Sequence, residues 1–297
     1  MKRRVFSHAL LGSAALGPVA LMAQNSEAWL SPPAAAAAWA AIEAQVGGRL
    51  GVAQWIDGEA APSGHRQDER FPMCSSFKAL LAGWTLHEAA AGRVRMGERL
   101  RFTRQALVPH SPVTGRHAGG PGLSLTQLCE ATVTTSDNTA ANLLLKRLGG
   151  PAGLTAFARR LGDASTRLDR FEPGMNTALN GDPRDTTTPA GMAQSLRQLL
   201  LGNALPPTER QALRQWLQAC GTGLDRLRAG LPADWVVGDK TGTGDNGSVI
   251  DVAVAWPPQG PARVITAYLH GSRAPFDRLK AALADAARVA ARVQPAA

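Results

Sequence analysis

The strongest constraint on the fold is the order in which two kinds of hydrophobic periodicity occur along the chain. Near the start, a stretch with apolar residues at helical spacing over 32–46 is followed by an apolar, strand-like run over 49–56. Near the end, residues 250–256 and 263–270 predict two further strands, and a helical apolar stripe covers 276–293. Strands from both ends of the chain can form one antiparallel sheet, and the two terminal helices can cover it.

The middle of the chain has a different pattern. Helical stretches over 123–134, 138–148 and 192–201 are separated by loops rich in Gly, Pro and Asp. We therefore predict an α+β fold, in which an antiparallel sheet is flanked by the N- and C-terminal helices and carries an inserted all-helical domain. The predicted boundaries are an α/β domain over 28–66 plus 220–295 and an all-helical domain over 67–219. A cleft between two such domains is a favoured place for a small ligand.

The N-terminus has the pattern of an export signal. Lys2, Arg3 and Arg4 precede an apolar stretch over residues 9–23 that is shorter than the ~20 residues of a transmembrane helix. We predict a signal peptide over residues 1–23, which is either a twin-arginine signal or an ordinary secretory signal. The mature protein is then expected in the periplasm or outside the cell, without membrane attachment.

The charge and the cysteines exclude several classes of function. The formal net charge is +9, and the first 23 residues carry three of the Lys and Arg side chains and no acidic one, so the mature chain has about +6. The basic residues are dispersed rather than clustered, which argues against a nucleic-acid partner. Cys74, Cys129 and Cys220 lack the spacing of metal ligands. We expect no metal, no cofactor, a small-molecule substrate and a monomer.

Ser75 and Lys78 form a candidate nucleophile and base, in the sequence Ser75-Ser76-Phe77-Lys78. If Ser75 opens a helix, Lys78 lies one turn later on the same face. A serine hydroxyl needs a base to become a nucleophile, and a partly desolvated lysine amine can serve as that base. Taken alone, the same four residues also fit an ordinary helix start.

Two further motifs carry polar groups suited to a cleft. In Ser136-Asp137-Asn138, Ser136 could relay a proton and Asn138 could hold a substrate amide, although these residues are also good helix caps. In Lys240-Thr241-Gly242-Thr243, Lys240 and the two threonine hydroxyls could bind a substrate carboxylate, and Gly242 would allow close approach to the backbone. Alternatively, this motif is only a turn before a strand, without a role in binding.

Together the three motifs resemble the Ser-x-x-Lys, Ser-Asp-Asn and Lys-Thr-Gly set of class A β-lactamases and penicillin-binding proteins. Residues 167–185 resemble the omega loop of the class A enzymes, and the resemblance covers about residues 30–293. It implies that Glu172, with Asn176, activates a water molecule, and that Arg170 pairs with Asp185 at the neck of the loop.

The resemblance also implies a reaction. Ser75 would attack the β-lactam ring of penicillins and cephalosporins, the N–H groups of Ser75 and Thr243 would form the oxyanion hole, and Glu172 would drive hydrolysis of the ester. Such an enzyme confers β-lactam resistance. Two further substrate-binding residues are implied: Arg226 as a carboxylate-assisting arginine, and His110, where the family often has an aromatic wall residue. Both Lys78 and Glu172 stay open as the base for acylation.

The sequence departs from the family at two disulfides, because the positions opposite Cys129 and Cys74 are held by Ala82 and Gly244. Three alternatives share parts of the pattern: a D,D-peptidase, a serine-dependent glutaminase, and a non-catalytic β-lactam or peptidoglycan sensor. A D,D-peptidase would lack a water-activating glutamate. A sensor usually keeps a membrane anchor and a signalling domain.

Overall fold

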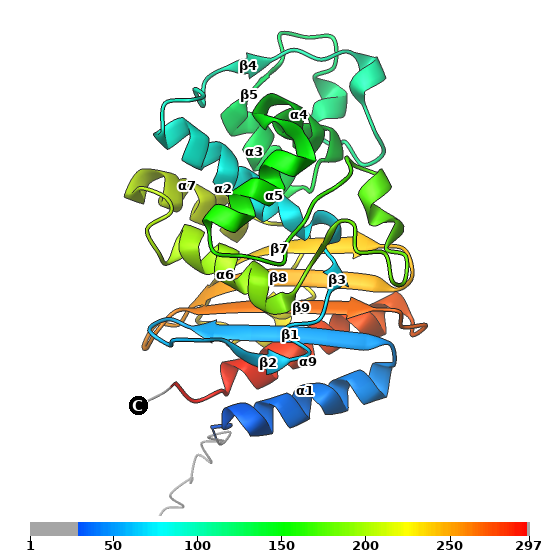
Figure 1. Cartoon of the computed structure of the whole chain (residues 1–297), viewed down its shortest axis with the longest axis vertical. Coiled ribbons are helices and arrows are strands. Elements are labelled where there is room, and N and C mark those ends of the chain that lie inside the picture. Colours follow the sequence, from blue (N-terminus) through cyan, green and yellow to red (C-terminus); the bar gives the residue numbers. More distant parts are fainter. Residues whose placement is uncertain (1–28, 296–297) are drawn as a thin grey trace, which may run out of the picture.

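The computed structural model describes residues 29–295, and the predicted signal peptide over 1–23 lies outside them. A five-stranded antiparallel sheet has the strand order β2-β1-β9-β8-β7. Its strands come from the two ends of the chain, as the periodicity predicts (Figure 1). The bounds are β1 Arg49–Ile56, β2 Ser63–His65, β7 Val236–Gly244, β8 Ser248–Trp256 and β9 Arg263–His270. The predicted α+β fold is confirmed.

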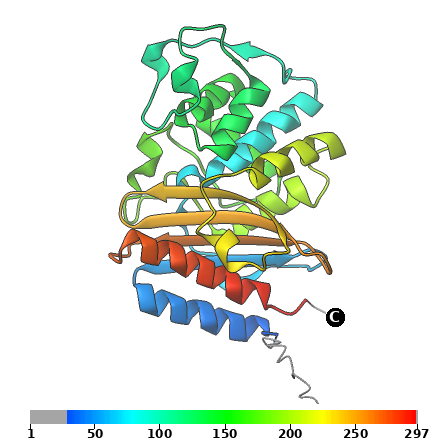
Figure 2. The same ribbon diagram turned by 180° about the vertical axis from the view of Figure 1, so that it is seen from behind.

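The two terminal helices, α1 (Pro32–Val46) and α9 (Phe276–Ala291), cover one face of this sheet (Figure 2). Helix α1 begins at Pro32 because the Ser31 side chain accepts a hydrogen bond from the Ala34 amide and proline needs no donor there. The Trp39 indole, which is fully buried, donates to the Ala286 carbonyl over 3.0 Å and so ties α1 to α9.

The first residue of the apolar stripe predicted for the last helix, Phe276, does not belong to the buried face. Phe276 is 46% exposed, whereas Leu279 and Leu283 are buried against the sheet. Phe276 is the first residue of α9, and its ring lies beside the Arg226 and Lys280 side chains instead of in the core.

The opposite face of the sheet carries most of the remaining helices. They are α2 Phe77–Ala90, α3 Leu125–Thr134, α4 Asn138–Leu148, α5 Gly150–Arg160, α6 Pro189–Leu200 and α7 Pro207–Gln218. The short α8 Leu227–Gly230 instead lies beside α9, on the face of the terminal helices. Short strand pairs join β3 Phe71–Pro72 to β6 Thr186–Thr187 and β4 Arg99–Leu100 to β5 Leu123–Ser124. Short 3-10 helices are η1 Cys74–Ser76, η2 Arg104–Ala106, η3 Thr114–Arg116 and η4 Gly174–Thr177.

Two predicted helices begin at different residues. The stretch predicted from 123 starts as a helix only at Leu125, because Leu123 and Ser124 pair with β4 and Ser124 forms a capping box with Gln127. The helix predicted from 192 begins earlier, at Pro189, after the side chain of Thr188 caps it. The exact division into an α/β and an all-helical domain stays a prediction.

Two hydrophobic cores follow from this arrangement. One lies between the sheet and the terminal helices and contains Trp39 and Leu283, and the other joins the sheet to the helices of the opposite face. In the second, Phe77 of α2 and Tyr268 of β9 are both fully buried. This core places the start of α2 beside the sheet, where β7 forms the edge strand. Among residues 29–295, no helix is long and apolar enough to cross a membrane.

Candidate active site

Ser75 lies in the 3-10 turn η1, which leads directly into α2. The α-helix therefore begins at Phe77, two residues later than the expected start at Ser75. Cys74 before it has a left-handed backbone (φ 44°), which turns the chain from the end of β3 into the helix. The expected proximity still results, because Lys78 Nζ donates to Ser75 Oγ over 2.8 Å.

Lys78 is fully buried and lies at the centre of the polar cluster. Its Nζ is 2.9 Å from the Ser136 carbonyl, 3.2 Å from Ser136 Oγ and 3.0 Å from Glu172 Oε1, and it also donates to Asn138 Oδ1. Burial lowers the pKa of Lys78 below the ordinary lysine value, while the Glu172 carboxylate opposes this shift. The ammonium is therefore easier to deprotonate than that of a solvated lysine.

In the Ser136-Asp137-Asn138 motif, Asp137 caps a helix, and the other two residues contact Lys78. Asp137 is the helix cap of α4: it accepts from the Ala140 amide over 2.8 Å and also binds the Thr114 amide and hydroxyl. Ser136, held in a left-handed conformation (φ 60°), and Asn138 direct their side chains to Lys78. The capping alternative thus applies to Asp137, while its two neighbours contribute to the polar cluster.

Glu172 lies opposite Lys78 and is 3% exposed. Its Oε1 accepts from Ser75 Oγ over 3.2 Å, and its Oε2 accepts from the side-chain amide of Asn176. Asn142 of α4 holds the backbone of Glu172 on both sides, accepting from its N–H over 3.0 Å and donating to its carbonyl over 2.9 Å. Asn142 is not among the residues predicted from the sequence, since an asparagine inside a helix carries no motif.

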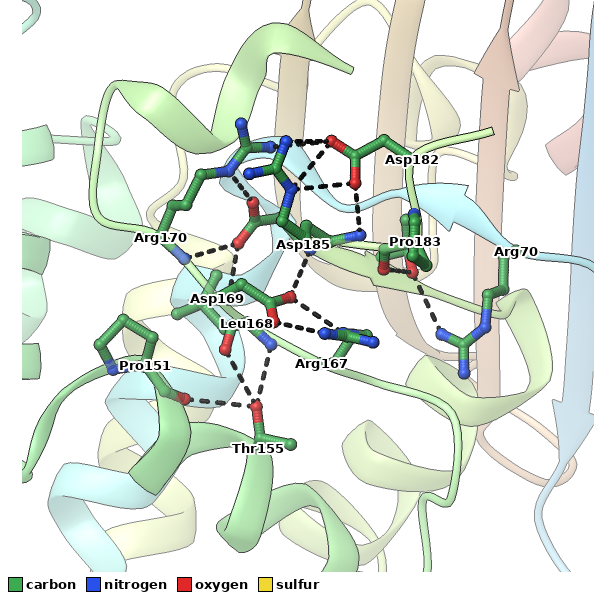
Figure 3. A network of polar contacts seen from close by, with 12 residues as sticks. Arg70, Pro151, Thr155, Arg167, Leu168, Asp169, Arg170, Asp182, Pro183 and Asp185 are labelled. Carbon is green, nitrogen blue, oxygen red and sulfur yellow. Dashed lines mark hydrogen bonds and ion pairs between the residues drawn. The ribbon is translucent and has the colours of Figure 1, made fainter. Parts of the chain in front are cut away.

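The neck of the omega loop is closed by an ion pair, as the resemblance implies (Figure 3). Arg170 Nε lies 2.6 Å from Asp185 Oδ2, and Asp185 Oδ1 accepts the amides of Asp169 and Arg170. Arg167 pairs with Asp169, and Asp182 pairs with Arg184. The two ends of the loop are brought together by the contacts of Asp185 with residues 169 and 170, whereas the Arg167–Asp169 and Asp182–Arg184 pairs each lie within one end.

Lys240 reaches the cluster from β7 on the other side of Ser136. Its fully buried Nζ lies 3.2 Å from Ser136 Oγ and 2.9 Å from the Thr241 carbonyl. Burial lowers the pKa of Lys240 to about 8, and the nearby Lys78 charge adds to the shift. Ser136 therefore lies between two lysines, which is an arrangement suited to passing a proton.

The edge of β7 also carries the predicted anion-binding groups. Arg226 Nη2 donates to Thr243 Oγ1 over 2.9 Å, and Arg226 Nη1 donates to the carbonyls of Gly242 and Ile250, each over 2.7 Å. Thr241 Oγ1 is 2.6 Å from Thr222 Oγ1. Thr222 belongs to a loop without a motif, so its place in the cavity could not be predicted from the sequence.

Gly242 lets β7 pass close to the candidate nucleophile. A Cβ at this position would lie 2.9 Å from the Met73 carbonyl oxygen and 3.2 Å from the Ser75 amide nitrogen. Any side chain would push the strand away from Ser75. The close approach explains why a glycine stands between Thr241 and Thr243.

These groups surround a cavity of about 330 Å³. His110, with a left-handed backbone (φ 60°), forms part of its wall and is fixed by a 2.9 Å contact between its Nε2 and the Thr135 carbonyl. The lining residues are Ser75, His110, Ser136, Asn138, Asn176, Thr222, Arg226, Thr241, Gly242 and Thr243. Lys78, Glu172 and Lys240 lie beneath this lining, where they contact its hydroxyl groups.

None of the three cysteines lines the cavity, although Cys220 Sγ lies 3.3 Å from the Thr222 hydroxyl. All three are buried free thiols, and burial raises their pKa, to about 12 for Cys129. A Cβ on Gly244 would lie 2.6 Å from Cys74 Sγ, so the two positions are adjacent although no bridge can form. Within residues 29–295, no group of His, Cys, Asp and Glu has the arrangement of a metal site.

Comparison with known proteins agrees with this geometry. The family model described as "Beta-lactamase enzyme family" matches residues 34–294. β-Lactamase L2 of Stenotrophomonas maltophilia is 43% identical over 97% of this chain and 96% of its own. β-Lactamase AST-1 of Nocardia asteroides is 47% identical over 84% of this chain and 81% of its own.

Solved structures agree as well. The ancestral (GNCA) class A β-lactamase has 53% sequence identity and a TM-score of 0.84, with 86% of this chain and 98% of that chain covered. Identity at this level over nearly the full described length supports common activity as well as common fold. The chain therefore belongs to the class A serine β-lactamases, enzymes that hydrolyse β-lactam antibiotics and so confer resistance to them.

Proposed function

We propose that the enzyme hydrolyses penicillins and cephalosporins through an ester on Ser75, which water activated by Glu172 then cleaves. The observation that carries this proposal is the position of Ser75 Oγ, which is 2.8 Å from Lys78 Nζ and 3.2 Å from Glu172 Oε1. One hydroxyl thus contacts both groups that could accept its proton. Either Lys78 or Glu172 can act as the base for acylation.

In the first half of the reaction, Ser75 Oγ attacks the carbonyl carbon of the β-lactam ring and the C–N bond breaks. The amides of Ser75 and Thr243 would stabilise the oxyanion, and the close passage of β7 along Ser75 supports this pairing. Ser136 Oγ would give its proton to the departing nitrogen and recover one from Lys78, or from Lys240, both within 3.2 Å.

In the second half, the Glu172 carboxylate takes a proton from water, and the water oxygen attacks the ester carbonyl. Asn176, which donates to Glu172 Oε2, would hold the same water molecule. The proton then returns to Ser75 Oγ as the ester bond breaks. This half distinguishes a hydrolase from a penicillin-binding protein, which stays acylated.

Substrate binding follows from the cavity walls. The Lys240 ammonium, the Thr241 and Thr243 hydroxyls and Arg226 would bind the substrate carboxylate. Asn138 would hold the amide of the acyl side chain, and His110 would form the opposite wall. A monomer without a nucleic-acid or membrane partner, exported to the periplasm or beyond by the signal peptide, completes the proposal.

The test is hydrolysis of a chromogenic cephalosporin by the purified enzyme and two variants. We expect rapid turnover by the wild type, none by Ser75→Ala, and almost none by Glu172→Ala. Full activity of either variant would refute the role given to that residue. Peptide-substrate cleavage without β-lactam turnover would instead favour a D,D-peptidase, and β-lactam binding without any turnover would favour a sensor.

A further inference from the structure

The second half of the omega loop is fastened to the sheet by contacts that are separate from the loop's neck. Asn246 Nδ2, in the turn between β7 and β8, donates to the carbonyls of Thr177 and Ala178, each over 3.1 Å. We call these two hydrogen bonds the Asn246 clamp. Next to it, the Asp245 amide donates to the Asn176 carbonyl over 3.0 Å. The loop runs beside the ends of β7 and β8 in Figure 1.

The turn itself explains why asparagine can stand at this position. Asn246 (φ 56°) and Gly247 (φ 65°) both have left-handed backbones, as the tightest hairpin turns require. Asparagine and glycine are the residues that best tolerate this conformation. Glycine would serve the turn equally well, so the side-chain amide of Asn246 is not needed for the hairpin.

On the loop side, the clamp acts directly after the water-holding residue. Ala178 has a left-handed backbone (φ 43°), which is uncommon for alanine and persists only where neighbouring contacts hold it. The carbonyl of this residue is one of the two acceptors. Asn176, two residues earlier in η4, donates its side-chain amide to Glu172. Fixing residues 177 and 178 therefore fixes the end of η4 and the direction of the Asn176 side chain.

A second contact supports the same segment from the end of β9. His270 Nε2 lies 2.7 Å from Asn180 Oδ1, and His270 Nδ1 lies 2.8 Å from Ser248 Oγ. Between these anchors and the loop lies a hollow of about 360 Å³, lined in part by Arg49, Leu179 and His270. Because the segment is not packed on a continuous core there, its position depends on a few polar contacts.

We propose that Asn246 is a positioning residue for the deacylation half of the reaction, acting through its clamp on Thr177 and Ala178. The inference rests on the proposed function, in which Asn176 and Glu172 hold the hydrolytic water. Without the clamp, Asn180 still contacts His270 and Thr177 Oγ1 still accepts from Arg170 Nη1, but residues 177 and 178 lose their side-chain bonds to the sheet and Asn176 is oriented less firmly. With Lys78 as the base, acylation uses Ser75, Lys78 and Thr243, none of which bonds to the Asn246 side chain, and so that step proceeds as before.

Kinetics can separate this role from a general structural one. The value of kcat/KM reports the steps up to acylation, so slower deacylation lowers kcat and KM together and leaves kcat/KM unchanged. We expect kcat of Asn246→Gly to fall about tenfold, because the loop loses the stabilisation of two neutral hydrogen bonds. KM should fall by a similar factor where deacylation limits turnover. A quenched intact-mass time course should show the Ser75 adduct decaying about tenfold more slowly.

Two further variants complete the test. Asn246→Asp also tolerates the turn but has no side-chain N–H, and its carboxylate would face two carbonyl oxygens, so deacylation should slow at least as much. Asn203→Gly removes an exposed asparagine side chain from the loop between α6 and α7, where it has no hydrogen-bond partner among residues 29–295. Its kinetics should match the wild type.

The outcomes separate the inference from the proposed function. A Ser75 adduct that decays equally fast in the wild type and in both Asn246 variants would overturn only the role of Asn246. A loss of kcat/KM equal to the loss of kcat, with KM unchanged, would also overturn it, because acylation would then be damaged. Failure to trap any Ser75 adduct in Glu172→Ala would overturn the acyl-enzyme proposal and this inference together.

Discussion

Replacing Asp185 by Asn tests whether the neck of the omega loop is held by charge or only by shape. The side chain of Asp185 is 1% exposed, and it accepts from two backbone amides and from Arg170 Nε. Asparagine can still accept from the two amides with its oxygen, but its NH₂ group then faces the Arg170 guanidinium donor. One charge-assisted hydrogen bond is lost and a donor faces a donor.

The expected cost is about 2–3 kcal/mol, typical of a hydrogen bond to a charged group. It stays below the value for a fully buried pair because the Arg170 side chain is 24% exposed and regains water. For a domain of this size, that corresponds to a Tm lower by roughly 4–8 °C. Because the neck holds Glu172, we also expect kcat to fall at least tenfold.

Calorimetry and steady-state kinetics on Asp185→Asn provide the measurement, and Asp182→Asn is the matched control. Asp182 pairs with Arg184, which is 49% exposed, and reaches Arg170 only at 3.9 Å, so the control should change stability and activity much less than Asp185→Asn does. If Asp185→Asn has the Tm and the kcat of the wild type, the ion pair does not hold the loop. Equal losses in both variants would mean that the neck responds to any change of charge.

Two further predictions concern groups around the cavity. Asn142→Ala leaves the buried N–H and carbonyl of Glu172 without their 3.0 and 2.9 Å hydrogen-bond partners. We therefore expect a Tm several degrees lower and a kcat reduced at least tenfold in the same assays. A wild-type kcat would mean that other contacts hold the backbone of Glu172. Lys240, with its pKa lowered to about 8, is charged below that pH and neutral above it. The KM for a carboxylate-bearing β-lactam should therefore rise as the pH passes about 8. A KM that stays constant up to pH 9 would contradict this prediction. Between about 8 and the ordinary lysine value the unfolded chain binds more protons than the folded one, so Lys240 alone should make stability rise with pH there.

The fold could be predicted largely because its two ends carry clear periodicity. The strands 250–256 and 263–270 alternate or run apolar between turn residues, and β8 and β9 follow them closely. The errors fall at boundaries decided by tertiary pairing. Residues 123–124 have helical neighbours but pair with β4, and Phe276 fits the helical stripe but is 46% exposed. The Ser124–Gln127 capping box is a local signal for the later helix start, whereas the pairing with β4 and the exposure of Phe276 depend on tertiary contacts.

The candidate site was predictable where it consists of motifs. Ser75, Ser136 and Lys240 converge as the resemblance to the class A motif set implies, with both lysines within 3.2 Å of the Ser136 hydroxyl. The supporting residues were not predictable in the same way. Asn142 and Thr222 matter only because folding brings them beside Glu172 and Thr241, and isolated polar residues in helices and loops give no such signal.

The most direct test of the mechanism is the mass of the Glu172→Ala protein after mixing with a penicillin. We predict that nearly all of the protein gains the full mass of the β-lactam within the mixing time, that the adduct maps to Ser75, and that it persists for hours. The wild type should return to its free mass once the substrate is consumed. An unmodified Glu172→Ala protein, or an adduct on another residue, would contradict the acyl-enzyme route.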